Sequence, residues 1–215
     1  MDFEQVADIV DGIPHTSRKH GRALYDLVRG YRLRNCLELG FAHGTSSCYI
    51  AAALHEEGMG FLTTIDNQAA LRRKPDIFTL LEKTGLQTYV HPIFANTSYN
   101  WELMKMIEKR TADPAGQPLF DFCFVDGAHT LEADGLAFFL VEKLLKPGGW
   151  LLFDDLWWTF ASSQSMRNTD LVKNMPEDER ATQQVAKVFE LLVQQHPCFG
   201  DFKIEGSWGW ARKKA

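Results

Sequence analysis

The segment Cys36–Ser47 constrains the fold of this chain more than any other part of the sequence. A short apolar run ends at Glu38-Leu39, and Gly40 and Gly44 stand four positions apart before a helical pattern begins. This order predicts a strand, a tight turn and a helix start, which is how a parallel α/β sheet forms a nucleotide-type pocket. Glycine permits positive φ and close approach to a ligand, and the first amides of the helix are free to bind an anion.

Apolar runs and helical patterns alternate along most of the chain. Five runs have the length and composition of strands, at residues 35–39, 61–65, 88–93, 120–125 and 150–153. Helical patterns, the first of them capped by Thr16 or Ser17, cover residues 17–29, 45–57, 75–85, 97–110 and 131–145. This alternation predicts a parallel sheet with helices on both faces.

Turns and a hairpin complete the pattern. Asp113–Gly116 predicts a turn, and Lys146–Gly149 predicts a break between a helix and the next strand. Residues 199–205 and 207–212 flank Gly206 as two strands, which predicts an antiparallel hairpin at the sheet edge. The expected fold is α/β: a Rossmann-like, doubly wound, mostly parallel seven-stranded sheet with an antiparallel C-terminal hairpin and helices on both faces.

The chain length of 215 residues fits one α/β domain over residues 1–215. Residues 1–30 are expected to form an N-terminal helical cap on this domain. Residues 157–178 contain Ser, Asn and Met without a clear period, and a helix is expected over 181–196. Because a loop this long in a compact domain is usually functional, residues 157–178 are expected to form a substrate lid.

Composition narrows the partners and the compartment. The net charge of −5 argues against a general nucleic-acid binder, and no run of about 18 apolar residues predicts a membrane span. The first eleven residues carry acids and no basic region, so we expect no signal peptide. The four cysteines are widely spaced without a C-x-x-C pair, which is typical of buried free thiols. We expect a cytoplasmic protein that binds neither nucleic acid nor membranes.

Acidic residues end four of the predicted strands, at Glu38, Asp66, Asp126 and Asp154-Asp155. Each acid alone could cap a turn or a helix. Ligands of open α/β sheets bind at the carboxyl ends of strands, so four acidic ends together predict a site. An acid at the position of Asp66 can accept both hydroxyls of a ribose, and this holds for a dinucleotide and for S-adenosylmethionine alike.

Three motifs make the prediction more specific. The sequence E-L-G-F-A-H-G-T-S-S resembles the E-x-G-x-x-x-G-x-S signature of class I S-adenosylmethionine-dependent methyltransferases. F-D-F-C-F-V-D-G-A-H-T and L-L-K-P-G-G-W-L-L-F-D-D are similar to two further motifs of that superfamily. The D-G-A-H and D-D pairs together most resemble its metal-dependent small-molecule O-methyltransferases, which include macrolide-sugar and catechol enzymes. Ala42 replaces a glycine of the dinucleotide fingerprint and no Tyr-x-x-x-Lys follows, which disfavours a nicotinamide oxidoreductase.

The resemblance implies roles for individual residues. Ser46 would hold the carboxylate of S-adenosylmethionine, and Asp66 its ribose. The complete implied cofactor site is Glu38, Gly40, Phe41, Gly44, Ser46, Asp66, Asn67, Ala95, Asn96 and Asp126. The implied metal ligands are Asp126, Asp154 and Asp155, and the implied catalytic residues are Asp126 and His129, the latter as general base.

Elementary electrostatics supports a cation beside these carboxylates. Three converging acids repel one another, and bound Mg²⁺, which prefers oxygen ligands, removes that repulsion. Trp157 and Trp158 follow directly and either form a wall of the substrate pocket or pack beneath the loop. The expected reaction is Mg²⁺-assisted O-methylation of a small molecule such as a sugar, diol or phenol. A metal-independent enzyme with an N or C acceptor and a non-catalytic cofactor-binding domain stay open, as does a homo-oligomer.

Overall fold

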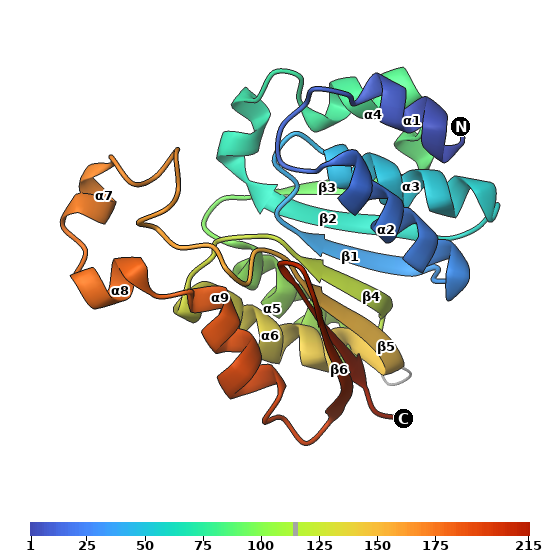
Figure 1. The fold of residues 1–215 in the computed structure, drawn as a ribbon. Coiled ribbons are helices and arrows are strands. Elements are labelled where there is room, and N and C mark those ends of the chain that lie inside the picture. Colours follow the sequence, from blue (N-terminus) through green and yellow to red (C-terminus); the bar gives the residue numbers. More distant parts are fainter. Residues whose placement is uncertain (114–115) are drawn as a thin grey trace.

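The computed structural model describes residues 1–113 and 116–215. Its centre is a seven-stranded sheet with the strand order β3-β2-β1-β4-β5-β7-β6 (Figure 1). The parallel strands are β1 (Asn35–Leu39), β2 (Phe61–Asn67), β3 (Val90–Ala95), β4 (Phe120–Val125) and β5 (Leu145–Phe153). The antiparallel strands are β6 (Phe199–Glu205) and β7 (Trp208–Lys213). The predicted doubly wound sheet with a C-terminal antiparallel hairpin is confirmed.

Helices cover both faces of the sheet (Figure 1). One layer contains α1 (Phe3–Ile9), α2 (Arg18–Gly30), α3 (Thr45–Glu56) and α4 (Ile77–Thr84). The other contains α5 (Tyr99–Ala112), α6 (Leu131–Leu144), α9 (Gln184–Lys187) and a π-helical segment over Val188–Val193. Alternate residues of each central strand point to opposite faces, so Cys36 packs in one core and Leu37 in the other. Each layer of helices therefore has its own apolar core against the sheet.

Local side chains fix where the helices begin and end. The Ser17 hydroxyl accepts the N–H of His20 and caps α2, as predicted. The carboxylate of Asp76 accepts the N–H of Thr79 at 2.8 Å, so α4 begins at Ile77, two residues after the predicted start. Gly85 ends this helix in the left-handed conformation.

Two segments differ most from the sequence-based expectation. Lys146–Gly149 does not precede the strand but belongs to β5, because Phe120 pairs with Leu145 and a register shift absorbs the extra residues. The helix expected over 181–196 is divided into α9 and the π-helical segment, after the short α8 (Glu177–Ala181). The turn predicted at 113–116 lies partly outside the described residues.

The segment 157–178 is largely irregular. It contains α7 (Asp170–Lys173) and the start of α8, which extend away from the body of the molecule (Figure 1). Among the described residues, no helix combines the length and the apolar character needed to cross a membrane. All four cysteines are free, as predicted, and Cys36, Cys48 and Cys123 are buried, but Cys198 is exposed where a buried thiol was expected.

Candidate functional site

The loops after β1, β2, β4 and β5 converge on a cavity of about 520 Å³ at the carboxyl edge of the sheet. This is the edge at which open α/β sheets bind ligands. The predicted residues that line it are Gly40, Phe41, Ser46, Asp66, Asn67, Asp126, His129, Asp155 and Trp158. Residues that the sequence did not assign to the site also line it, among them His15, Thr16, Arg73, Tyr99, Phe160, Ser163, Ser165 and Met166.

Gly40 allows the loops after β1 and β4 to touch. Its φ is +89°, and a Cβ atom at this position would lie 2.0 Å from the carbonyl oxygen of Asp126. The N–H of Asp126 donates to the carbonyl oxygen of Leu39 at 2.9 Å, which holds the two loops together. A side chain at position 40 would separate the turn at residues 40–44, called the glycine turn below, from Asp126.

Asp66 organises the glycine turn. Its Oδ2 atom accepts the backbone N–H groups of Phe41 at 3.0 Å and Ala42 at 2.8 Å. Its Oδ1 atom accepts the N–H of Asn67 at 2.6 Å. The carboxylate that was predicted to bind a ribose therefore holds the glycine turn in place. The ribose contact itself stays a prediction.

Asp126, His129 and Asp155 form a compact group. Their candidate ligand atoms all lie within 4.8 Å of one another. The His129 Nε2 atom is 3.0 Å from Asp155 Oδ2 and 3.8 Å from Asp126 Oδ1. His129 Nδ1 lies 2.8 Å from the carbonyl oxygen of Gly127, so this nitrogen carries the proton that is donated there. The ring therefore presents Nε2 to the carboxylates.

The charges of this group are not balanced. Burial, and then the neighbouring charge of Asp154, raise the pKa of Asp126 well above its ordinary value. Burial alone would lower the pKa of His129, but the hydrogen bond to Asp155 and the charge of Asp126 raise it to about 9. Asp126 and Asp155, with Asp154 close by, thus have the single imidazole of His129 to balance their charges. The arrangement has the donor chemistry of a divalent-cation site.

Asp154 lies outside this group. Its Oδ1 atom accepts the N–H of Asp155 at 2.6 Å and the hydroxyl of Ser207 at 3.2 Å. Burial, and then the charge of Asp155, raise its pKa. The structure therefore brings together two of the three implied metal ligands, Asp126 and Asp155, and adds His129 in place of Asp154.

Glu38 is fully buried behind the glycine turn. Its Oε2 atom accepts the hydroxyls of Ser47 and Thr64, the latter at 2.6 Å. Its Oε1 atom has no hydrogen-bond partner among the described residues, and burial raises its pKa. Four members of the implied cofactor site do not line the cavity, and these are Glu38, Gly44, Ala95 and Asn96.

The two tryptophans after β5 point in different directions. The Trp158 ring lies 4.8 Å from the His129 ring and lines the cavity. Trp157 is exposed, and its indole N–H donates to the carbonyl oxygen of Gly206 at 2.7 Å. Only Trp158 has the position of a substrate contact, while Trp157 fastens the start of the loop to the β6–β7 hairpin.

Backbone strain concentrates at this cavity. Among the described residues, six other than glycine have positive φ, and four of these line the cavity: His15, Ala42, His129 and Asp155. Such conformations persist where the surrounding structure enforces them, often at functional sites. No sequence pattern announces them, which is one reason why His15 was missed.

A buried pair supports the loop after β4. The hydroxyl of Tyr99 donates to Asp134, and the N–H of Ala128 donates to the same hydroxyl oxygen at 3.3 Å. Burial raises the pKa of Asp134. The pair lies 35 positions apart in the sequence, so the sequence alone offered no signal for it.

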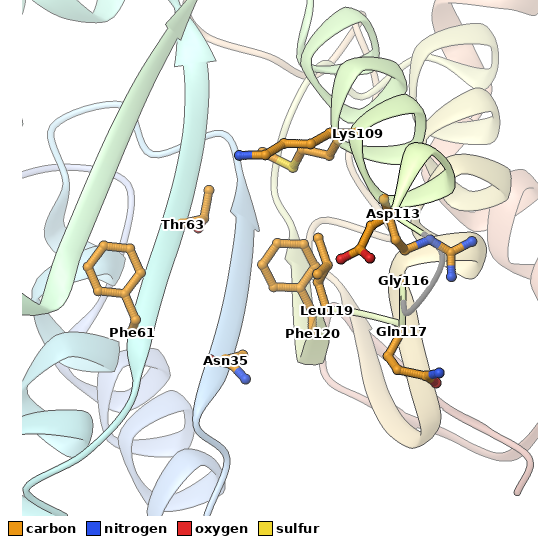
Figure 2. Close-up of a pocket in the computed structure, with 11 residues that line it drawn as sticks. Asn35, Phe61, Thr63, Lys109, Asp113, Gly116, Gln117, Leu119 and Phe120 are labelled. Carbon is orange, nitrogen blue, oxygen red and sulfur yellow. The ribbon is translucent and has the colours of Figure 1, made fainter.

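A second cavity, of about 540 Å³, lies at the opposite, amino-terminal edge of the sheet (Figure 2). Asn35, Phe61 and Thr63 line one side of it, and Lys109 and Leu119 are among the residues on the other. None of the predicted site residues lines it. Its volume is similar, so the chemistry of the lining and not the size distinguishes the candidate site.

Comparisons with known proteins agree with this geometry. Residues 37–156, more than half of the chain, match a family model described as "Methyltransferase domain". The chain has no match among curated proteins.

Solved structures resemble the whole chain. One is the O-methyltransferase TomG from Streptomyces achromogenes, which is involved in tomaymycin synthesis and was solved in complex with S-adenosylmethionine. It is 20% identical to this chain with a TM-score of 0.64, and the match covers 99% of this chain and 89% of that chain. The O-methyltransferase from Bacillus cereus in complex with S-adenosylhomocysteine has 21% identity, a TM-score of 0.63 and coverage of 99% and 90%. The S-adenosylhomocysteine-bound Podospora anserina methyltransferase PaMTH1 has 16% identity, a TM-score of 0.66 and coverage of 99% and 87%. At these identities, the likeness shows the fold alone.

Proposed function

We propose that this chain, which belongs to the methyltransferase-domain family, transfers the methyl group of S-adenosylmethionine to a hydroxyl group of a small molecule and that a divalent cation assists the transfer. The observation that carries the proposal is the group formed by Asp126, His129 and Asp155 in the cavity at the carboxyl edge of the sheet, which we call the donor cavity. An acceptor hydroxyl must lose a proton and be oriented toward the methyl group, and this group of residues suits both tasks.

The donor occupies the glycine-turn side of the cavity in this proposal. Phe41, Ser46, Asp66 and Asn67, which the resemblance assigns to the donor, line the cavity. The free amides at the start of α3 suit an anionic group of the donor. Glu38 lies behind this surface, and its role toward the donor is the support of the turn through Ser47.

Asp126 and Asp155 would hold the cation, and the Nε2 atom of His129 would stay free of it. The unbalanced acids and the raised pKa of Asp126 support a cation there, since positive charge would relieve their repulsion. When bound, Mg²⁺ would lower the pKa of the acceptor hydroxyl and orient it. Neutralising Asp126 and Asp155 would also remove the charges that raise the pKa of His129, and so return its imidazole to the neutral form.

His129 acts as the general base. With its Nδ1 proton held by the Gly127 carbonyl, the neutral ring accepts the hydroxyl proton at Nε2. The acceptor oxygen forms its bond to the methyl carbon as the bond from that carbon to the donor sulfur breaks. S-Adenosylhomocysteine and the methyl ether are the products.

The segment 157–178 serves as the substrate lid in this proposal, and residues 1–30 cap the same single domain. Trp158, Phe160 and Met166 give the cavity an apolar wall on the acceptor side. This wall suits the ring of a sugar or a phenol. TomG and the Bacillus cereus protein, which share this fold, are O-methyltransferases.

The test measures binding and transfer separately. Calorimetry with S-adenosylhomocysteine reports the donor site. Mass spectrometry then follows methyl transfer to a panel of catechols, sugar diols, phenols and amines, with Mg²⁺ and with a chelator. Transfer to hydroxyl acceptors that stops with the chelator and returns with Mg²⁺ is the expected result. Transfer to amines only, or undiminished transfer with the chelator, overturns the proposal in its acceptor or its metal part.

A further inference from the structure

We propose that Arg73, positioned by His15, binds the carboxylate of the methionine part of the methyl donor. This inference rests on the proposed donor and adds two residues from outside the glycine motif to its site. Arg73 follows the short 3-10 helix after β2, and His15 precedes α2, so neither belongs to a motif that the sequence displayed.

The start of α3 is prepared for an anion. The first intrahelical hydrogen bond runs from Cys48 N–H to the Gly44 carbonyl, so the N–H groups before it have no partner within the helix. No side chain caps this helix of 12 residues. Thr45, only 2% exposed, lines the cavity, and its hydroxyl has no hydrogen-bond partner among the described residues. A buried hydroxyl without a partner is costly unless a ligand supplies one.

Arg73 brings a positive charge to the same cavity. Arg73 lines the cavity, and its guanidinium forms no ion pair with the described carboxylates. Its Nη1 atom lies 3.2 Å from His15 Nε2, which as acceptor of this hydrogen bond carries its own proton on Nδ1. The guanidinium thus keeps other N–H groups for an anion, and its planar geometry matches a carboxylate.

His15 ties this charge to the glycine turn. Its ring stacks on His43, with 5.7 Å between the centroids, and His43 Nδ1 lies 2.6 Å from the Pro75 carbonyl oxygen. His15 has a backbone φ of +87°, which residues other than glycine rarely adopt. Burial, and then the charges of Arg73 and His43, lower its pKa. The strained backbone therefore supports an imidazole that acts as an acceptor for Arg73 beside the turn.

The contacts favour the donor carboxylate over an anionic group of the acceptor. The chain of contacts from Arg73 through His15 to His43 ends within the turn that leads into α3. The acceptor, in contrast, belongs beside His129 and Asp155, where the hydroxyl must meet the base. A carboxylate at the start of α3 would be attracted by the helix amides and by the guanidinium of Arg73, which lines the same cavity.

Two ligands that differ in the carboxylate test the proposal. S-Adenosylhomocysteine carries the amino acid part, and 5′-methylthioadenosine keeps the nucleoside and sulfur without it. Calorimetry compares wild type, Arg73→Ala, Arg73→Lys and the control Arg72→Ala, whose exposed arginine is adjacent but does not line the cavity. We expect Arg73→Ala to weaken S-adenosylhomocysteine about tenfold or more, as for loss of a charge-assisted hydrogen bond, and to leave 5′-methylthioadenosine unchanged. Arg73→Lys should lose less, and Arg72→Ala should bind both ligands as wild type does.

A double-mutant cycle tests the positioning role of His15. Asparagine tolerates positive φ but is too short to hold the guanidinium in place, so His15→Asn should weaken S-adenosylhomocysteine severalfold. In the Arg73→Ala background the same change should have no further effect, because His15 acts through Arg73. Circular dichroism checks that each variant is folded.

The outcomes separate this inference from the proposed function. If wild type does not bind S-adenosylhomocysteine, the proposed donor is wrong. If wild type binds it and Arg73→Ala weakens both ligands equally, or neither, the carboxylate contact is wrong. Additive losses in the double mutant would overturn the positioning role of His15.

Discussion

The two ends of β4 each carry an aspartate, and their surroundings are opposite. Asp121 accepts the N–H groups of Arg34 at 3.1 Å and Asn35 at 2.8 Å, and its other oxygen accepts the Lys146 ammonium at 2.8 Å. Burial alone would raise the pKa of Asp121, but Lys146 and these amides lower it. Asp126, at the other end, faces further acids, and its pKa is raised.

This is the difference expected between a structural acid and a functional one. The carboxylate of Asp121 is supplied with donors and a cation by neighbouring strands, so it stabilises the folded chain as it stands. Asp126 lies 3.8 Å from the imidazole of His129, which it shares with Asp155. Its ionised form is therefore unfavourable in the absence of a further positive charge. Groups whose pKa values are shifted against their own charge gather at functional sites. Substitutions at and near the two ends of β4 test this contrast.

His129→Gln should lower kcat/KM by about 10²- to 10⁴-fold, the usual contribution of a general base. Glutamine keeps a polar side chain but cannot accept the proton. Steady-state kinetics with an acceptor found in the panel gives the ratio. An intact affinity for S-adenosylhomocysteine in calorimetry serves as the control, and a variant with wild-type kcat/KM would contradict the assigned role.

Asp126→Asn should separate activity from stability. The variant loses a carboxylate of the proposed cation site, so we expect Mg²⁺-dependent transfer to fall by at least about tenfold. Without ligands it should unfold at the same or a higher urea concentration, because the repulsion between acids is reduced. Urea denaturation and kinetics on the same preparation provide both values. A clear loss of stability would show that Asp126 is a structural acid.

Asp121→Asn is the matched change at the other end of β4. We expect it to reduce the free energy of unfolding by about 1–3 kcal/mol, as for the loss of charge-assisted hydrogen bonds. The kcat of the folded fraction, measured well below the unfolding temperature, should stay at the wild-type value. A selective loss of kcat in a stable variant would remove the distinction between the two ends.

The difference in stability between wild type and Asp121→Asn should depend on pH, because the pKa of Asp121 is lowered in the folded state. A carboxyl whose pKa is lower in the folded state adds stability above its unfolded pKa, about 3.9, and this stability is lost as the pH falls through the folded value. The difference in unfolding free energy between wild type and Asp121→Asn should therefore be full at pH 7 and decrease on acidification toward pH 3. Urea unfolding across this range measures it, and a constant difference would contradict the assignment.

The smallest effect is expected at Trp157. Trp157→Phe removes an indole hydrogen bond to Gly206 at a residue that is 46% exposed, so the stability should change by less than about 1.5 kcal/mol and kcat/KM should not change. Trp158→Ala, the adjacent change inside the cavity, should instead raise KM for the acceptor. Equal effects at the two positions would mean that their opposite orientations have no functional meaning.

Much of the fold was predictable because its signals are local. Strands β1 and β4 appear at the predicted residues, since buried parallel strands form continuous apolar runs. Ser17 and Gly85 marked helix ends through their own side chain or backbone freedom. The start of β5 at Leu145 was not predictable, because a register shift against Phe120 depends on a partner strand.

Local patterns in the sequence specified the doubly wound sheet, the edge at which the candidate site lies and the acids that stand there. Period, turn residues and strand ends decide these, and all are properties of neighbouring residues. Folding, and no local pattern, placed His129 beside Asp126 and Asp155 and turned Asp154 toward Ser207. It also brought Arg73 and His15 to the donor cavity. Such choices depend on side-chain directions and on contacts between segments that are distant in the chain, and no local pattern encodes them.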